Sequence, residues 1–323
     1  MKRIATALFL LFGTVAAAPV HSQAAYPSRP VQIVAPVPPG SPPDMLARLL
    51  GERLGRALGQ PVIVENRPGA SGTIGLDQVA RATPDGHTLG ILSMPVTIVP
   101  SLRAAMPFDV TKDLAPVRQV VWAGTILVVR SESPYQSLDD LVAEARKAPG
   151  QLTFASGGAG TPSHVAGELL SRSIASEVRH VPYKGAPEGV SAVMSGQVTM
   201  MFAAAGAVAP HLSSGKLRGI AVPTPTRLSV FPNIPTMAER GFRDFDVRDW
   251  LGVVAPPATP PHILQRLSKE IDEITASKEV RARFLDLGME VVETSSPDDF
   301  GVLIRSETSR WAQFVRQTGL KAE

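Results

Sequence analysis

The chain alternates between short apolar runs and segments in which apolar residues recur every three or four positions. VQIVAPV (31–37) is almost entirely apolar, which predicts a buried strand. From Asp44 onward, leucines recur at helical spacing as far as Gly59, and PVIVEN (61–66) predicts the next strand. Strand, loop, helix and strand therefore follow one another within 36 residues, which is the length of a βαβ unit.

The same order of elements returns 120 residues further along the chain. QLTFAS (151–156) predicts a strand, GGAGTP (157–162) a turn, and the spacing of apolar residues from Val165 to Ile174 a helix. VRHVPY (178–183) predicts the returning strand. Two units of similar layout suggest two lobes built alike, although βαβ units are too common for the pattern alone to prove this.

The remaining segments fit an α/β chain. Two long apolar segments, 121–130 and 245–256, have the length needed to cross between two lobes. The other predicted elements are strands at 86–93 and 216–223, a helix that begins near Gly72, a helix at 137–150 capped by Ser137, a helix followed by a strand within 190–204, and helices at 262–276 and 297–317 around a short strand near Met289–Val292.

The first residues have the pattern of an export signal rather than of a folded element. Lys2 and Arg3 precede an apolar run over 4–18, and Ser22 and Ala24 stand at the −3 and −1 positions of a signal-peptidase site. We predict a signal peptide over 1–24, cleaved after Ala24, and a periplasmic protein. The alternative is an anchor helix, but the apolar run is short for a membrane span and ends in small residues. No cysteine follows, so lipid attachment at a processed cysteine is excluded.

Composition narrows the classes of function that remain. Without Lys2 and Arg3 the chain has 30 basic and 29 acidic residues, a net charge of +1, and only 5% of all residues are aromatic. A nucleic-acid surface is therefore not expected. Zero cysteines exclude a disulfide scaffold, so core packing must provide the stability. No apolar stretch beyond the signal is long enough to span a bilayer.

The glycine-rich turn at 157–162 is the main candidate for chemistry. A turn that enters a helix leaves several backbone N–H groups without partners at the positive end of the helix dipole. Glycines allow positive φ and a close approach of a ligand, and Thr161 and Ser163 add hydroxyl groups. Such a turn can bind a small anion. It can equally be a tight βα turn whose glycines serve geometry alone, and the residues by themselves do not decide between the two.

Nucleotide, catalytic and metal sites find little support. No Walker loop occurs, and GASGTIG (69–75) does not have the glycine spacing of a dinucleotide fingerprint. Ser163 and His164 are adjacent, so on a helix they cannot form a nucleophile–base pair, and no G-x-S-x-G elbow is present. The histidines are scattered without ligand spacing, so we predict no metal or cofactor and expect surface or cap positions for His87, His164, His180, His211 and His262.

A set of motifs spread over nearly the whole chain resembles one family. In order they are YPSRPVQIVAPVPPG, ENRPGASGTIG, PDGHTL, FASGGAGTPSHVAGELL, HVPYKGA, SGQVTMMF, SGKLRGIAV, RLSVFPNIPTMAERGF and WLGVVAPPATP. They resemble the Bug-type extracytoplasmic solute receptors, the substrate-binding components of tripartite tricarboxylate transporters. The resemblance covers residues 26–320.

The resemblance implies a type II periplasmic binding protein with two βα lobes joined by two crossing strands. Lobe 1 would comprise 25–124 and 249–323, and lobe 2 would comprise 125–248. Such a receptor captures a small carboxylate, or a similar organic ligand, between its lobes and delivers it to integral-membrane transporter subunits. The resemblance implies no enzymatic activity, no cofactor, no nucleic acid and a monomer.

The family's ligand contacts come largely from backbone and hydroxyl groups of βα loops. Carried over position by position, the ligand-binding candidates are Pro38, Pro39, Gly40, Ser41, Ser93, Gly157, Gly158, Ala159, Gly160, Thr161, Ser163, Tyr183, Lys184, Gly185 and Ala186. The secondary candidates are Gly69, Ala70, Ser71 and Asp249. Lys184 can also be a solvated turn residue and Tyr183 a packing residue, and packing against the crossing strand is the favoured interpretation for Trp250.

The first of these loops departs from the family pattern. Members commonly have PGG-x-x-D there, whereas this chain has PGSPPD, with Ser41 in place of a glycine and two prolines that lack an N–H. Asp44 would also repel an anion unless it caps its own helix. We therefore predict a weaker or relocated anion site in the first lobe, so that the ligand presents an apolar or uncharged end here. A sensor that docks a signalling partner and an exported hydrolase are the alternative functions.

Overall fold

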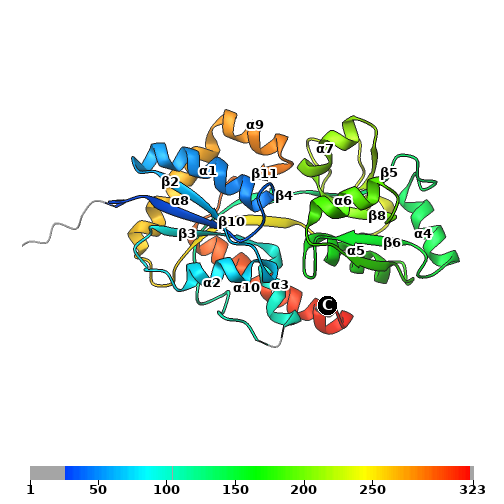
Figure 1. The fold of residues 1–323 in the computed structure, drawn as a ribbon, viewed down its shortest axis with the longest axis horizontal. Coiled ribbons are helices and arrows are strands. Elements are labelled where there is room, and N and C mark those ends of the chain that lie inside the picture. Colours follow the sequence, from blue (N-terminus) through cyan, green and yellow to red (C-terminus); the bar gives the residue numbers. More distant parts are fainter. Residues whose placement is uncertain (1–25, 104, 321–323) are drawn as a thin grey trace, which may run out of the picture.

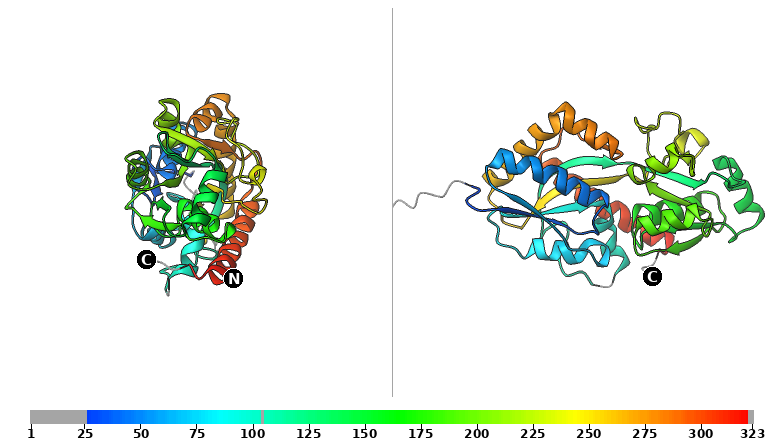
Figure 2. Two further views of the ribbon diagram at one scale, coloured as in Figure 1. Left: turned by 90° about the vertical axis from the view of Figure 1, so that its right-hand side faces the viewer. Right: turned by 45° about the horizontal axis from the view of Figure 1, so that its top comes forward.

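The computed structural model describes residues 26–103 and 105–320, and the predicted signal peptide lies outside the described residues. Figure 1 shows two halves side by side, each a sheet with helices packed on its faces. The predicted α/β class is thus confirmed. Figure 2 shows the same two halves end to end from a second direction.

The first sheet has the strand order β11-β4-β10-β3-β1-β2. Its strands are β1 (Val31–Ala35), β2 (Val62–Asn66), β3 (Thr88–Ser93), β4 (Ala115–Ala123), β10 (Asp249–Ala255) and β11 (Met289–Val291). β1 pairs with β2 and β3 in parallel, and β10 pairs with β3 and β4 in antiparallel orientation. The first strand ends at Ala35 rather than at Val37, and Pro36, which follows it, has no N–H to donate.

The second sheet repeats this topology. Its order is β7-β6-β8-β5-β9, with β5 (Thr125–Arg130), β6 (Thr153–Ser156), β7 (Arg179–Pro182), β8 (Met200–Ala204) and β9 (Leu217–Ala221). β6, β7 and β8 correspond in place and direction to β1, β2 and β3 of the first sheet. The antiparallel strand β5 occupies the place that β10 has in the first sheet. We call the first sheet with its helices lobe 1 and the second sheet with its helices lobe 2.

The helices follow the strands as the apolar spacing predicts, with three additions. Lobe 1 contains α1 (Pro42–Leu58), α2 (Thr73–Ala80), α3 (Met94–Leu102), α8 (Pro261–Ala276), α9 (Lys278–Asp286) and α10 (Pro297–Thr318). Lobe 2 contains α4 (Leu138–Lys147), α5 (Pro162–Ser173), α6 (Ala186–Met194) and α7 (Ala205–Ser213), and short 3-10 turns lie at Ala70–Gly72 and Ala238–Arg240. The sequence did not predict α3, α7 and α9.

Local signals set the ends of several helices. Gly59 ends α1 with a φ of 69°, a left-handed conformation that glycine adopts at low cost. Ser137 caps α4 and Ser296 caps α10, each in a capping box with an aspartate three residues later. Asp140 and Asp299 therefore serve as caps, and the aspartate before each lies in the same first turn, where the helix dipole favours a negative charge.

Two segments connect the lobes. The predicted crossing segment 121–130 is two strands, because β4 ends at Ala123 in the first sheet and β5 begins at Thr125 in the second. The chain returns to lobe 1 through β10, which begins at Asp249. We keep residues 124 and 249 as the proposed limits of the lobes.

The apolar core continues from one lobe into the other. One cluster of buried side chains extends from Val34 and Ile98 in lobe 1 to Phe154 and Phe202 in lobe 2. Trp250 belongs to this cluster, is fully buried and packs edge-on against Phe300. Trp250 is therefore a packing residue of the returning strand, as the sequence favoured.

Candidate functional site

The carboxyl ends of the parallel strands of both lobes face each other. Ser93 ends β3 and pairs with Leu251 near the start of β10, where the chain arrives from lobe 2. In lobe 2, Ala204 ends β8 and pairs with Thr125, where the chain arrives from lobe 1. Ligands of open α/β sheets bind outside the carboxyl ends of the strands, so the space between the lobes is the candidate site.

Loops from the two lobes touch across this space. The hydroxyl of Ser71 donates a hydrogen bond of 3.2 Å to the backbone oxygen of Ala159. Gly160 lies so close to α3 that a Cβ added to it would be 2.9 Å from Ile98 Cγ2 and 3.3 Å from Leu102 Cδ1. The sequence-predicted loops 69–72 and 157–161 are thus brought together, and the lobes are closed upon each other here.

Most of the polar groups of the glycine turn are used to hold the turn itself. The amides donate as follows: Gly157 to Ser163 Oγ, Gly158 to Ser156 Oγ, Gly160 to His164 Nδ1 and Thr161 to the Gly158 oxygen. Thr161 also donates its hydroxyl hydrogen to Gly158, at 2.7 Å. Within the described structure, the amides of Ala159, Ser163 and His164 have no such partner.

This arrangement revises the expected donor set. The hydroxyl of Thr161 is committed to the turn and is not available to a ligand, whereas Ser163 can still donate its hydroxyl hydrogen, to Thr161 or to a ligand. The free amides of Ser163 and His164 lie in the first turn of α5, where the helix dipole favours an anion. Ala159 precedes them in the same turn.

A stack of rings supports the turn from behind. His164 is 2% exposed, and its ring stacks on that of His180 at 4.2 Å, which in turn stacks on Phe154 at 4.8 Å. The expectation of a surface or cap position is therefore wrong for His164, and it is also wrong for His87, which is 6% exposed. Burial, followed by the charge of His180, lowers the pKa of His164 to about 4. A neutral imidazole is required here, because Nδ1 accepts the hydrogen of the Gly160 amide.

The loop at 69–72 has an unusual backbone. Gly69, Ala70, Ser71 and Gly72 all have positive φ, with 50° at Ala70 and 57° at Ser71. The left-handed conformation costs a non-glycine residue about 1–2 kcal/mol, and such strain is concentrated at ligand clamps and active sites. Because Ser71 also contacts the turn of lobe 2, we promote this loop from a secondary to a principal candidate.

The first-lobe loop has few free donors. Asp44 accepts hydrogen bonds from the Gly40 amide at 2.8 Å, from Arg48 and from Asn66. Burial acts to raise the pKa of Asp44, but these hydrogen bonds together lower it below its usual value. Pro42 and Pro43 occupy the first turn of α1 and lack an N–H. The Asp44 carboxylate therefore accepts the hydrogen bonds that its own loop can donate, and the head of α1 has few free N–H groups for an anion.

A buried carboxyl group lies at the head of α3. Asp249 is 9% exposed and accepts a hydrogen bond of 3.3 Å from the Met94 amide, which directly follows Ser93. Burial raises the pKa of Asp249 to about 7, against the smaller opposing effect of its backbone hydrogen bonds. Asp249 thus occupies, with its own carboxyl group, the place where α3 would otherwise accept a ligand anion.

The VPYKGA segment forms the far wall of the glycine turn. A Cβ on Gly157 would lie 3.1 Å from the Ala186 amide nitrogen and 3.4 Å from the Gly185 carbonyl carbon. Tyr183 is half-buried beside the apolar cluster of α6 and α7, which supports a packing role. Lys184 is exposed, and its amide donates to Glu188.

One polar residue near the candidate site was missed by the sequence interpretation. Thr125 begins β5, is 5% exposed, and its hydroxyl has no hydrogen-bond partner among the described residues. It pairs with Ala204, directly before the head of α7. A buried hydroxyl without a partner is costly, so Thr125 joins the candidate donors. The only signal in the sequence was one threonine within the apolar segment 121–130.

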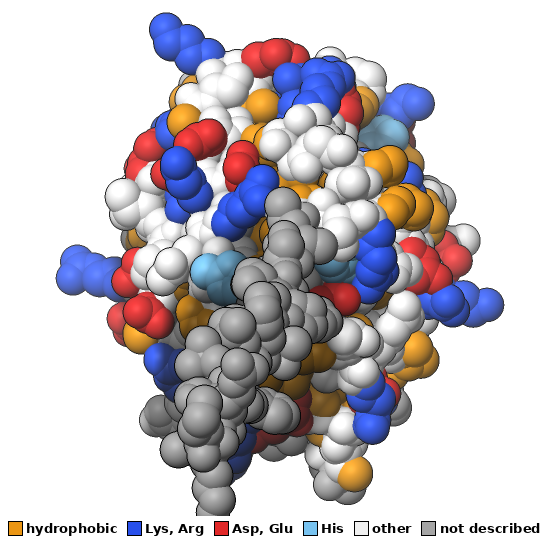
Figure 3. All heavy atoms as spheres, turned by 90° about the vertical axis from the view of Figure 1, so that its left-hand side faces the viewer, with side chains coloured by type: hydrophobic (Ala, Val, Ile, Leu, Met, Phe, Trp, Pro, Cys, Tyr) orange, Lys and Arg blue, Asp and Glu red, His pale blue; other side chains and the backbone are white. Residues whose placement is uncertain are grey.

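Three further features concern the surface charge, the helices and the possible metal ligands. On the face of lobe 1 shown in Figure 3, basic and acidic side chains alternate without forming a patch of one sign. Among the described residues, no helix combines the length and apolar character of a membrane span. The same residues contain no group of three or more His, Asp or Glu placed to hold a metal ion.

Comparison with known proteins places these features in one family. Residues 46–320 match the family model described as tripartite tricarboxylate transporter family receptor. The chain is 36% identical to Protein BugT of Bordetella pertussis, over 99% of both chains. It is 30% identical to the periplasmic binding protein BugD, with a TM-score of 0.84. That match covers 92% of this chain and all of BugD. It is also 30% identical to R. palustris Rpa4515, solved with adipate, with a TM-score of 0.86 over 92% and 99% of the two chains.

Proposed function

The chain belongs to the tripartite tricarboxylate transporter receptors, a family of periplasmic binding proteins, and from this premise we propose that it binds a small organic carboxylate between its lobes and delivers it to a membrane transporter. The type II two-lobed fold and the match to Rpa4515 with adipate support this proposal. The members compared above are binding proteins, so we propose no chemical conversion of the ligand.

The observation that carries the proposal is the head of α5. The amides of Ala159, Ser163 and His164 remain without partners in a turn that faces lobe 1, while every other amide of the turn is committed. Free amides at a helix start, aligned with its dipole, are suited to a carboxylate. We propose that one ligand carboxylate binds there, with Ser163 as a further donor.

We propose that the other end of the ligand is apolar or uncharged. Asp44 already accepts the Gly40 amide, and Asp249 already accepts the Met94 amide, so the heads of α1 and α3 are both occupied by acidic side chains of the protein. Two prolines remove further donors from α1. The loop at 69–72, which contacts the glycine turn through Ser71, is a principal proposed contact, and the exposed Lys184 side chain is a proposed contact at the edge of the site.

Binding is coupled to closure of the lobes. A ligand that contacts both lobes stabilises the closed state by its higher affinity for that state. We propose that the closed monomer is the form that the membrane subunits recognise. We further propose that the signal peptide directs the chain to the periplasm and is cleaved after Ala24.

A matched pair of acids tests the proposed ligand class. We expect hexanoate to raise the Tm of the purified mature protein by several degrees, because a ligand at about 100 times its Kd adds about 2.7 kcal/mol of stability. Adipate, which has the same chain length and a second carboxylate, is expected to bind no more tightly. Native mass spectrometry of the protein as purified checks whether a carboxylic acid is already bound. The mass of the released acid then checks that the protein has not altered it chemically. Tighter binding of adipate, with one carboxylate against Ser41, would refute the single-carboxylate proposal.

The residue Ser163 offers a direct test of the α5 amides. Ser163→Pro gives α5 two consecutive prolines at its start, as α1 has naturally, and removes one free N–H. We expect the affinity for carboxylates to fall about tenfold or more, the usual loss for a hydrogen bond to a charged group. Ser163→Ala keeps the N–H and serves as the control for the hydroxyl. Isothermal titration that finds both variants equally affected would argue against an amide contact.

A further inference from the structure

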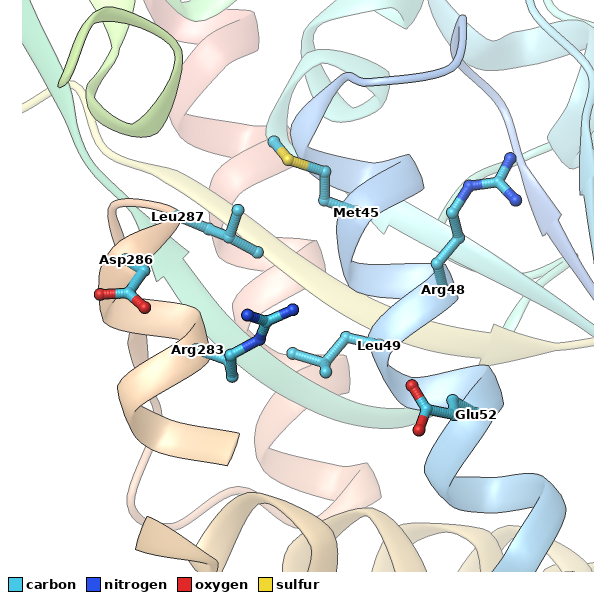
Figure 4. A pocket seen from close by; sticks show the side chains of 7 residues that line it. All are labelled: Met45, Arg48, Leu49, Glu52, Arg283, Asp286 and Leu287. Atoms are coloured by element: carbon cyan, nitrogen blue, oxygen red, sulfur yellow. The ribbon is translucent and has the colours of Figure 1, made fainter. Parts of the chain in front are cut away.

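A groove outside the ligand site lies between α1 and α9. It has a volume of about 350 Å³ and is lined by Met45, Leu49 and Leu287 together with charged side chains from both helices. Figure 4 shows the groove running along α1 from Met45, one turn after the first-lobe loop, toward Glu52. Its floor is formed by these three apolar side chains. The exposed apolar side chains Ile63 and Val302 do not belong to the groove, because they lie on β2 and α10.

The charged side chains of the groove are not equivalent. Arg48 is paired with Asp44 at 2.9 Å, and Glu52 accepts a bond of 2.7 Å from Arg56. Arg283 is exposed, and no hydrogen bond or close ion pair joins it to a described residue, although its charge acts on Glu279 one turn earlier in α9. In Figure 4 its guanidinium points between Leu49 and Leu287, while the carboxylate of Asp286 is directed away from it. The groove therefore presents the Arg283 cation beside an apolar floor, with the Asp286 carboxylate directed away from that cation.

One end of the groove touches lobe 2. Leu287 is followed by Gly288, and a Cβ on Gly206 of α7 would lie 2.2 Å from the Leu287 oxygen. The amide of Gly124, the residue between β4 and β5, donates to the Gly288 oxygen at 3.1 Å. The groove thus ends at the pivot between the lobes, where α7 stands against it. A partner seated in the groove and touching α7 would contact both lobes.

We propose that the α1–α9 groove is the docking site for an extracytoplasmic segment of the membrane transporter subunit, one that presents a carboxylate side chain next to a bulky apolar side chain. The carboxylate pairs with Arg283, and the apolar side chain rests on Met45, Leu49 and Leu287. Contact with α7 makes the docked segment sensitive to the angle between the lobes. This inference rests on the proposed transport function.

Photo-crosslinking in intact cells tests the proposal. A benzoylphenylalanine side chain introduced at position 49 of the full-length chain is expected to form a product with the membrane subunit, identified by its peptides in mass spectrometry. The same side chain at position 269, which is on the exposed face of α8, is expected to form none. Adding Arg283→Glu should lower the yield at position 49 about fivefold or more, as for an interface contact worth more than about 1 kcal/mol. Lys269→Glu, with the same change of charge, should leave it unchanged.

Three results would overturn the proposal: no product at position 49, a product with a second copy of this chain, or equal yields with and without Arg283→Glu. The thermal shift of each purified variant with hexanoate verifies that it is folded and binds carboxylate. Loss of docking with an intact thermal shift thus separates this inference from the proposed function. A protein that crosslinks to the transporter but binds no carboxylate would instead contradict the proposed ligand.

Discussion

Replacing Gly160 with valine is expected to hold the lobes apart and to weaken carboxylate binding about 100-fold, because a closing penalty of about 3 kcal/mol has this effect on an apparent affinity. A Cβ at this position would already lie 2.9 Å from Ile98 Cγ2 and 3.3 Å from Leu102 Cδ1. Gly160 belongs to lobe 2 and α3 to lobe 1, so the simplest relief of this contact is opening of the cleft. The branched side chain of valine enlarges the conflict.

Titration of hexanoate and small-angle X-ray scattering together check this expectation. The variant should have a lower affinity and a larger radius of gyration than the wild type. Gly215→Val is the matched control, because Gly215 has a φ of 68° against 77° for Gly160 but has no atom within 4 Å of an added Cβ. The control contains the same backbone strain without the contact between lobes. Adding Ile98→Ala to Gly160→Val should restore part of the affinity. If it does not, the contact between the valine side chain and Ile98 is not the cause of the weaker binding.

The stabilities of Asp249→Asn and His164→Asn are expected to depend on pH with opposite signs. The pKa of Asp249 is raised from 3.8 to about 7, so between these values the folded state binds more protons than the unfolded state and stability increases as the pH falls. The pKa of His164 is lowered from 6.5 to about 4, so in its window the unfolded state binds more protons and stability decreases as the pH falls.

The two effects oppose each other in the wild type. From about pH 7.5 to about pH 4.5 the Asp249 shift adds stability and the His164 shift removes it, each by a few kcal/mol. Asp249→Asn removes only the stability that the raised pKa of Asp249 adds as the pH falls. This variant should therefore lose stability on acidification relative to the wild type. His164→Asn removes only the loss of stability that the lowered pKa of His164 causes as the pH falls, and it retains an acceptor for the Gly160 amide. This variant should therefore gain stability on acidification relative to the wild type.

Urea unfolding of the ligand-free proteins across this pH range measures both slopes. The comparison uses the change of the free energy of unfolding with pH, because each substitution also has a pH-independent cost. A double variant contains neither group, so it should show little pH dependence from this pair. Parallel curves for the wild type and both variants would mean that neither group is buried with the shifted pKa described here.

The strands and most helices follow from periodicity along the chain, whereas three helices do not. α3 contains Pro95 and Pro100 and a run of β-branched residues, and α7 contains Gly206 and Pro210, so both have weak helical propensity. They form because packing outweighs propensity: α3 lies against α10 and α7 against β8 and β9. α9 follows α8 after Ser277 alone and was too short to distinguish from its neighbour.

The candidate site shows the same division. The position of the glycine turn before α5, the proline pair of α1 and the capping aspartates can be predicted because they depend on residues a few positions apart. The commitment of the turn's amides to Ser156, Ser163 and His164 is also local in sequence, but it depends on rotamers that no pattern reveals. The contact of Ser71 with Ala159 joins residues 88 positions apart and required the folded chain.

The sequence by itself predicted the α/β order, two units of similar layout and the shortage of amide donors in the first loop, since these depend on local spacing and on which residues lack an N–H. Only the tertiary structure decided which amides remain free, which acids are buried and where the lobes meet. The burial of Asp249 and His164 and the lone hydroxyl of Thr125 arise from contacts between distant segments. Desolvation and hydrogen-bond satisfaction are properties of packed groups, and a linear pattern does not specify the packing.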